Sequence, residues 1–223
     1  GNGTYPTCSN GTAVDLFTKL TGSPNAGGAW TLAGVPVSNM FTPGTSTAGA
    51  YSYTVNGTPP CPNATATVTV SVIAAPDAGN SASIIVCSND AQFSKRSQLG
   101  GTPQPGGTWS PGGSDVFIPG TTAPGPYTYT VAGTPPCANA AATLTITIRD
   151  APVAGNGRAI SVCTNGAVFN LLDSLGGVPD AGGTWTGPGG THSDQFQPGT
   201  DPGGPYVYQV TGQEPCSPAP ATV

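Results

Sequence analysis

Apolar and hydroxyl-bearing residues alternate along several short stretches of the chain. Residues 143–148 read Thr-Leu-Thr-Ile-Thr-Ile, and Val68, Val70 and Val72 are separated by Thr or Ser in the same way. A period of two is typical of a β-strand with one face in a core and the other in solvent. Helical turns are indicated only at residues 94–99 and 170–175, each followed by Gly. We therefore predict an all-β protein with very little helix.

The strand pattern occurs three times at a nearly constant interval. One Trp, one Phe and two Cys mark each copy, and the three Trp residues stand in GGAWT, GGTWS and GGTWT. The number of residues from the first Cys to the Trp is the same in every copy, as is the number from the Phe to the second Cys. Self-similarity of this kind predicts tandem modules. We place three repeats at residues 1–75, 76–151 and 152–223.

Each repeat has the signature of a two-sheet β-sandwich. Short strands with Gly and Pro between them, and a Cys, a Trp and a second Cys in that order, are typical of immunoglobulin domains. No Tyr stands two residues before the second Cys, so we predict a topology that is only immunoglobulin-like. Trp rings can also serve as sugar platforms, but one Trp at a fixed place beside Gly-Gly favours a core. The predicted core markers are Trp30, Trp109, Trp185, Phe41, Phe117 and Phe196.

The third repeat differs from the others at its end. Val223 aligns with Val68 and Leu144, which lie inside the predicted last strands of the first two repeats. We therefore expect the last strand of the third repeat to be incomplete. Either residues that follow Val223 or a strand from a neighbouring chain would complete it.

Composition shows why such modules need covalent support. Gly (34) and Pro (25) make up about a quarter of the 223 residues, and fewer than one residue in five is Val, Leu, Ile or Phe. Chains of this composition are usually disordered. A formal net charge of only −5 and a strict repeat argue against disorder here. Small modules bury little apolar surface, so they commonly rely on disulfides.

Six cysteines are available for that purpose, and six cysteines allow 15 pairings. We predict one disulfide inside each repeat, because this scheme leaves no cysteine unpaired: Cys8–Cys61, Cys87–Cys137 and Cys163–Cys216. Pairing across the joints, Cys61–Cys87 and Cys137–Cys163, would leave two cysteines alone and would join residues that strands hold far apart. Disulfides also predict an oxidising compartment outside the cytoplasm.

Chemistry-bearing residues are sparse. The only His, His192, precedes Ser193 and Asp194, but a catalytic triad needs side chains that converge from separate elements. We predict an exposed loop there and no enzyme activity. No CxxC or paired His is present, so we predict no cofactor and no metal. A loose calcium site at Asp77 or Asp150 is the less favoured alternative.

Charge and hydropathy exclude two classes of partner. Ten acidic residues outnumber five Lys and Arg, and no basic cluster occurs, so we expect no binding to nucleic acid or to anionic lipid. No run of about 18 apolar residues is present, so we expect no membrane span.

The repeated motifs GGTWT, FIPGT and PYTYTVAGTPPC, with joints that read Ala-Pro-x-Ala-Gly-Asn, resemble a known family. They are similar to the tandem repeats of very large Bacteroidota surface adhesins, of the gliding-motility type that the type IX system secretes. The resemblance covers all three repeats. It implies a cell-surface location and a role in adhesion or stalk building, and it supplies no active-site residues.

These observations together predict a non-enzymatic, extracellular structural or adhesive segment that acts as a stiff stalk or adhesin at the cell surface. Its expected partners are other modules of the same or identical chains, with a surface polysaccharide or a protein as the class of ligand. The alternative is a self-assembling extracellular filament subunit, completed by a strand from a neighbouring chain.

Overall fold

The computed structural model describes residues 1–223, and the chain is all-β. Besides strands it contains three short 3-10 turns, namely η1 (Leu16–Lys19), η2 (Arg96–Gln98) and η3 (Leu171–Ser174). The turns predicted at residues 94–99 and 170–175 are therefore confirmed as η2 and η3. The chain divides into two compact units, of which the first comprises residues 1–81, 99–113 and 128–143, and the second the remaining residues. No helix has the length and hydropathy to cross a membrane.

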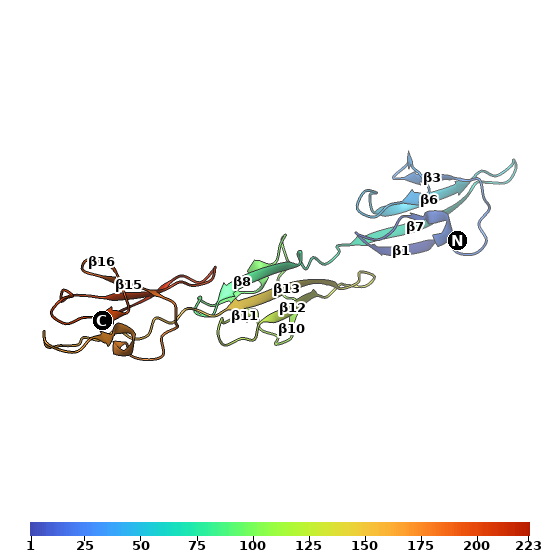
Figure 1. Ribbon diagram of the computed structural model, residues 1–223. Helices are drawn as coiled ribbons and strands as arrows, with labels where there is room; N and C mark the ends of the chain where they lie inside the picture. The colour runs from blue at the N-terminus through green and yellow to red at the C-terminus, as the bar shows by residue number, and fades with distance from the viewer. The chain divides into compact units, whose positions relative to one another are not determined.

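Seven strands form the first repeat. A five-stranded sheet has the order β1-β7-β6-β3-β4, in which β1 runs parallel to β7 and the other neighbours are antiparallel (Figure 1). Its strands are β1 (Gly3–Cys8), β3 (Ala29–Leu32), β4 (Val35–Pro36), β6 (Gly49–Val55) and β7 (Ala64–Ile73). A second, two-stranded layer pairs β2 (Val14–Asp15) with β5 (Met40–Phe41).

The second repeat has the same plan. Its four-stranded sheet has the order β10-β12-β13-β8, with β8 parallel to β13, and β9 pairs with β11. The strands are β8 (Ala82–Cys87), β9 (Phe93–Ser94), β10 (Thr108–Ser110), β11 (Val116–Phe117), β12 (Gly125–Val131) and β13 (Ala140–Arg149).

The third repeat lacks the parallel pair. Its sheet has the order β16-β15-β18-β19, and β14 pairs with β17. The strands are β14 (Phe169–Asn170), β15 (Thr184–Gly187), β16 (Gly190–His192), β17 (Gln195–Phe196), β18 (Val207–Val210) and β19 (Ala219–Thr222). β19 has four residues where β7 and β13 have ten, and residues 158–163, which align with β1 and β8, form no strand.

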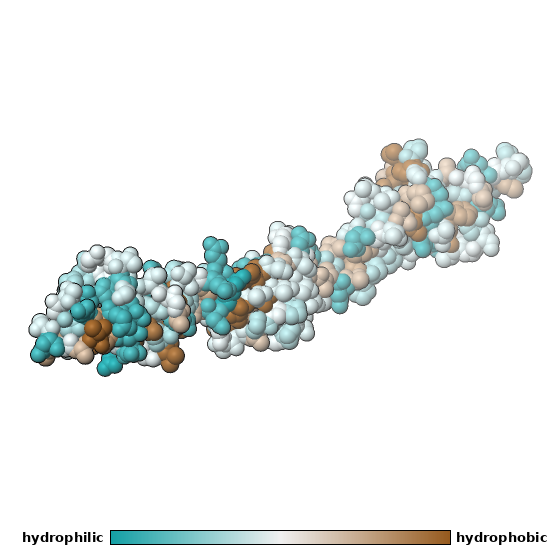
Figure 2. All heavy atoms as spheres, viewed as in Figure 1, coloured by the Kyte–Doolittle hydropathy of each residue, from teal (hydrophilic) through white to brown (hydrophobic).

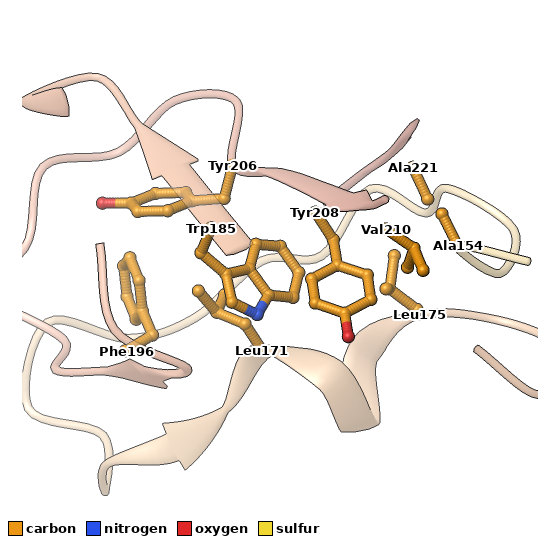
Figure 3. Close-up of a cluster of buried hydrophobic side chains, with 9 residues drawn as sticks. All are labelled: Ala154, Leu171, Leu175, Trp185, Phe196, Tyr206, Tyr208, Val210 and Ala221. Atoms are coloured by element: carbon orange, nitrogen blue, oxygen red, sulfur yellow. The ribbon is translucent and has the colours of Figure 1, made fainter. Parts of the chain in front are cut away.

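The core lies between the large sheet and the short second layer. In the third repeat, Trp185 occupies the middle of the buried cluster, with Tyr208 and Phe196 on either side and Leu171 of η3 below (Figure 3). In the first repeat, Phe41 of β5 and Leu16 of η1 face the large sheet in the same way. All six aromatic markers are buried: Trp30, Trp109, Trp185, Phe41, Phe117 and Phe196. Each repeat thus has sandwich architecture with one thin layer.

A Tyr beside each Trp explains the Gly-Gly pair of the repeated motif. The Tyr208 ring lies 5.0 Å from the Trp185 ring, and its hydroxyl donates to the Asp180 carbonyl and accepts from the Gly183 N–H, at 2.7 and 2.9 Å. The same three contacts recur in the other repeats, through Tyr53 and Tyr129. Because the ring passes directly beneath the second Gly of the pair, no side chain fits there.

The buried Lys95 is the one place where the repeats' cores differ in charge. Lys95 is only 2% exposed, and its Nζ lies 4.1 Å from the centre of the Tyr127 ring. The aligned residues Leu16 and Leu171 are buried leucines. Burial lowers the pKa of Lys95, and the nearby Asp115 carboxylate partly opposes that shift by raising it. Burial of the Lys95 ammonium therefore costs electrostatic free energy. The other two repeats have no such cost, because the aligned residue is a leucine.

We expect Lys95→Leu to raise the free energy of unfolding of the second repeat by about 1–3 kcal/mol, because buried charges are often replaced by apolar residues with a gain in stability. Leu171 is buried at the aligned position, and its N–H donates to the Asp194 carbonyl as the Lys95 N–H donates to the Asp115 carbonyl, so a leucine fits at this place in the repeat. Hydrogen exchange of β12 peptides measures the change. Since the folded pKa lies below the unfolded value, wild-type stability rises as pH rises through the lowered pKa, so the gain should shrink at alkaline pH. A variant less stable than wild type at neutral pH would contradict this prediction.

The surface carries no single apolar face in the view of Figure 2, where brown residues occur in several separate places on a largely near-white surface. Exposed large apolar side chains include Val35, Met40, Ile85 and Val178, which belong to different strands and loops. Scattered residues of this kind are normal on soluble surfaces.

Candidate functional site

The two disulfides join consecutive repeats, so the predicted pairing within each repeat is wrong. Cys8 is bonded to Cys137, with an S–S distance of 1.97 Å and Cα atoms 4.9 Å apart, and both residues belong to the first compact unit. Cys87 is bonded to Cys216, with distances of 1.93 and 5.1 Å, within the second unit. Each bond joins the first cysteine of one repeat to the second cysteine of the next. The pairing across joints that served as the alternative is not found either.

The parallel first strand explains this pairing. Cys8 ends β1 and lies opposite Ile73, the last residue of β7, whereas Cys61 precedes the first residue of β7. β7 has ten residues, which at about 3.3 Å per residue separate its ends by roughly 30 Å. Bridged cysteines need Cα atoms within about 7 Å. The two cysteines of one repeat therefore stand at opposite ends of the same strand and cannot meet.

Both disulfides are enclosed at the end of the strand that leads into the next repeat. The Sγ atom of Cys137 lies 3.5 Å from the Ile73 carbonyl oxygen and 3.6 Å from that of Ala74. Cys216 lies 3.5 and 3.4 Å from the equivalent oxygens of Arg149 and Asp150. A disulfide sulfur has no hydrogen to donate, so these are packing contacts. All four bonded cysteines are buried: Cys8, Cys87, Cys137 and Cys216.

Hydrogen bonds hold the joint residues beside each disulfide. The Ser9 N–H donates to the Ile73 carbonyl at 2.8 Å, and the Ala75 N–H donates to the Ser9 hydroxyl at 2.9 Å. Ser88 makes the same two bonds to Arg149 and Ala151, at 2.8 and 2.9 Å. The start of each joint is therefore held by hydrogen bonds to the serine that follows the bonded first cysteine.

The joint continues into the following repeat through paired backbone bonds. Asn80 and Gly100 exchange two hydrogen bonds, as do Asn156 and Gly176 in the second joint.

Asp77 is the less favoured candidate for a calcium site. Its carboxylate accepts from the Gly79 N–H at 2.8 Å. No three His, Cys, Asp or Glu side chains gather anywhere in the chain in a way that would hold a metal ion.

Cys61 and Cys163 remain unbonded, and both are exposed. Cys163 belongs to the segment that forms no strand. In the first two repeats the residues before the first cysteine pair with the second half of the last strand, but β19 ends at Thr222. One backbone bond, from the Arg158 N–H to the Thr222 carbonyl at 3.0 Å, joins the start of this segment to β19.

An apolar groove of about 440 Å³ lies beside this unpaired segment in the third repeat. Its lining includes Ile160 and Val162 of the segment, and Phe196, Tyr206 and Val223 of the sheets. The groove lies between the unpaired segment and the end of β19.

His192 forms no catalytic arrangement with its neighbours. It lies in the short strand β16 opposite Trp185, and its ring packs edge-on against Tyr206 at 4.8 Å. Its Nε2 lies 3.4 Å from the Asp201 carboxylate. The Gln197 N–H, and to a smaller extent His192, hold the pKa of Asp201 below its usual value. The contact therefore ties a loop to the edge of the sheet.

The residues next to His192 point elsewhere. The Ser193 hydroxyl is 3.1 Å from the Gln195 carbonyl, to which it donates, and Asp194 accepts from the Asn170 side chain at 3.3 Å. No nucleophile, base and acid converge. His192 lies in a strand rather than in the loop predicted from the sequence.

No protein-family model matches the chain, and no curated protein matches its sequence. Solved structures that are similar to it contain immunoglobulin domains in tandem. The titin I-band fragment I67–I69 is 12% identical with a TM-score of 0.43, over 99% of this chain and 94% of that one. Domains 3–5 of Drosophila OTK are 13% identical with a TM-score of 0.37, over 99% and 93% of the two chains. Sidekick-1 immunoglobulin domains 1–4 are 13% identical with a TM-score of 0.33, over 100% and 73%.

These scores are low, so the fold assignment rests on the sheets and cores described above. The predicted fold class, all-β with immunoglobulin-like sandwiches, is confirmed on that basis.

Proposed function

We propose that the chain is a non-enzymatic segment of an extracellular stalk or adhesin, whose repeats are clamped to one another by disulfides so that it bears tension. The observation that carries the proposal is the disulfide from each first cysteine to the second cysteine of the following repeat, which occurs twice at the same sequence separation of 129. The disulfides also support a location in an oxidising compartment, as at a cell surface.

The two bonds overlap in sequence, and this overlap limits how far the chain can be stretched. A force applied at the two termini passes from Cys8 to Cys137, back along the chain to Cys87, and from there to Cys216. Only the segments 1–8, 87–137 and 216–223 lie on that path. They contain about 65 residues, which at about 3.4 Å per residue extend to roughly 220 Å. The full 223 residues would extend to roughly 760 Å.

Single-molecule stretching from the two termini tests this function. We expect the oxidised chain to stop extending near 220 Å, and a variant with serine at all four bonded cysteines to reach about 760 Å. A variant that lacks only the Cys87–Cys216 bond should stop near 320 Å, because the segments 1–8 and 137–223 then lie on the path. Full extension of the oxidised wild-type chain would rule out a tension-bearing role for the disulfides.

A second candidate function, a filament subunit completed by a neighbour's strand, is favoured by the groove beside residues 158–163. The added strand would lie parallel to that segment, as β13 lies beside β8. A peptide with the sequence of residues 143–149 should therefore raise the melting temperature of the third repeat in a saturable way. A scrambled peptide is the control, and equal effects of both peptides would argue against strand addition.

A further inference from the structure

Arg149 gives the joint between the second and third repeats a polar side-chain contact. It is the last residue of β13, and its Nη1 donates to the side-chain carbonyl of Gln213, in the loop before Cys216. At the aligned position of the first joint, β7 ends in Ile73, and the loops of the first two repeats have a threonine in place of Gln213. The Arg149–Gln213 pair is therefore particular to the second joint.

The Arg149 guanidinium also has a nitrogen without a hydrogen-bond partner. Its Nε is buried and makes no hydrogen bond. A buried N–H that lacks an acceptor raises the free energy of the folded state, and in native proteins an ordered water or a ligand usually supplies the acceptor. The strand itself does not need the arginine, because Ile73 ends β7 at the aligned position. Folding of β13 therefore does not account for an arginine here.

A cleft of about 650 Å³ lies beside the Arg149–Gln213 pair, and all of its lining belongs to the second compact unit. We call it the joint cleft, and its volume is typical of a small-molecule site. Its lining includes four side chains with charged or amide groups and two apolar side chains: Arg149, Asp150, Asp180, Gln213, Pro152 and Val210. Both aspartates and Gln213 are exposed, so a ligand can reach them.

The charges of the joint cleft favour one chemical class of ligand. The guanidinium repels a metal cation, and the two carboxylates repel an anion. A hydroxyl group suits both kinds of side chain, because it can accept from the Arg149 guanidinium and donate to a carboxylate oxygen. Asp180 has an oxygen for this purpose, since its Oδ2 accepts from the Val153 N–H at 2.8 Å and Oδ1 is left over. The lining therefore matches a neutral ligand with several hydroxyl groups.

We propose that the joint cleft binds one or two sugar units of a neutral polysaccharide. Arg149 donates to one sugar hydroxyl, Asp150 and Asp180 accept from others, and Pro152 and Val210 offer apolar surface to the C–H groups of the sugar ring. This inference names a ligand class for the proposed adhesin, and it rests on that function for the extracellular location only.

The first joint is an internal comparison for this site. The residues aligned with Arg149, Asp150, Asp180 and Gln213 carry no charge, and they are Ile73, Ala74, Gln104 and Thr134. The same contacts cannot form there, so we expect one sugar site in the 223-residue chain, at the second joint.

An oligosaccharide array tests the inference with the oxidised 223-residue chain. The array carries neutral oligosaccharides of glucose, mannose, galactose and xylose, with oligogalacturonates and sulfated oligosaccharides beside them. We expect binding to at least one of the neutral oligosaccharides. Titration with that oligosaccharide should shift the NMR signal of the Arg149 Nε–H in a saturable way.

Arg149→Ile gives the second joint the residue that the first joint already has, so the variant should fold. We expect it to bind the same oligosaccharide at least tenfold more weakly, because a hydrogen bond from a charged donor is lost. Arg158→Ile is the matched control, since it removes the same charge from a residue of the third repeat that does not line the cleft. It should change the affinity by less than about twofold. Mapping of the Cys87–Cys216 bond checks that both variants fold.

Three results would overturn the inference: no binding to any neutral oligosaccharide, binding that Arg149→Ile leaves unchanged, or binding to the acidic oligosaccharides alone. The stretching experiment depends on the disulfides, which Arg149→Ile retains. The stalk can therefore fail its test while the sugar site passes this one, and the reverse also holds.

Discussion

A chain in which Cys8 and Cys137 are both replaced by serine is expected to melt on the order of 10–15 °C below wild type under non-oxidising, non-reducing conditions. The bond closes a loop with a sequence separation of 129, and in the chain-entropy model such a loop destabilises the unfolded state by about 5 kcal/mol. Each kcal/mol corresponds to roughly 2–4 °C for a chain of this size. Differential scanning calorimetry measures the shift.

The matched control replaces Cys61 and Cys163, which are exposed and unbonded. This double variant has the same change in composition and breaks no bond, so its melting temperature should stay within about 1 °C of wild type. Equal losses in the two variants would contradict the connectivity. A Cys8–Cys61 linked peptide in a non-reducing digest of wild type would do so directly.

Spacing along the sequence could not decide this connectivity. Pairing within repeats closes loops of similar length and pairing between neighbours has a constant separation, and only the first scheme leaves no cysteine unpaired. The deciding fact is that β1 runs parallel to β7, which brings Cys8 beside Ile73 at the end of the repeat. Alternation of apolar and polar residues indicates a strand and its buried face, but it carries no information about which neighbour the strand pairs with or in which direction.

The repeat pattern was more informative about the core and about the third repeat. A Trp at a fixed distance from the first cysteine is buried in every copy, and its environment is the same each time. In the third repeat, the turn predicted at residues 170–175 is found as η3, at the same position within the repeat as η2. Residues at the same position of the three repeats have the same environment, so alignment of the repeats is enough to predict these features.

Lys95 is a residue whose environment could not be predicted from the repeat pattern. At the position of two buried leucines, a lysine would normally indicate a solvent-facing residue. Tyr127 and Asp115, which make its burial tolerable, come from later in the repeat and are brought to it only by the fold. Long-range partners of this kind cannot be read from local pattern.

The sequence shows the Gly-Gly motif but not the Tyr ring that lies against its second Gly. This contact gives the second large effect that we expect. Gly183→Ala should lower the free energy of unfolding of the third repeat by about 3 kcal/mol, at the upper end of the usual cost of overpacking. A Cβ at this position would lie 2.5 Å from Cζ of Tyr208 and 2.6 Å from the Gln209 carbonyl oxygen. The Tyr ring is held by hydrogen bonds to Asp180 and Gly183, so it cannot move away without losing them.

Gly189→Ala, in the same repeat, is the matched control. No atom lies within 4 Å of the position that its Cβ would take, and its φ is not in the left-handed region, so the same methyl group meets open space. We expect this variant to change stability by less than about 0.5 kcal/mol. Hydrogen exchange of peptides that cover β18 reports the third repeat alone and compares the two variants directly. Similar protection in both would show that the Tyr208 ring does not impose the glycine, and the reason for the Gly-Gly pair in all three repeats would then lie in the turn rather than in the core.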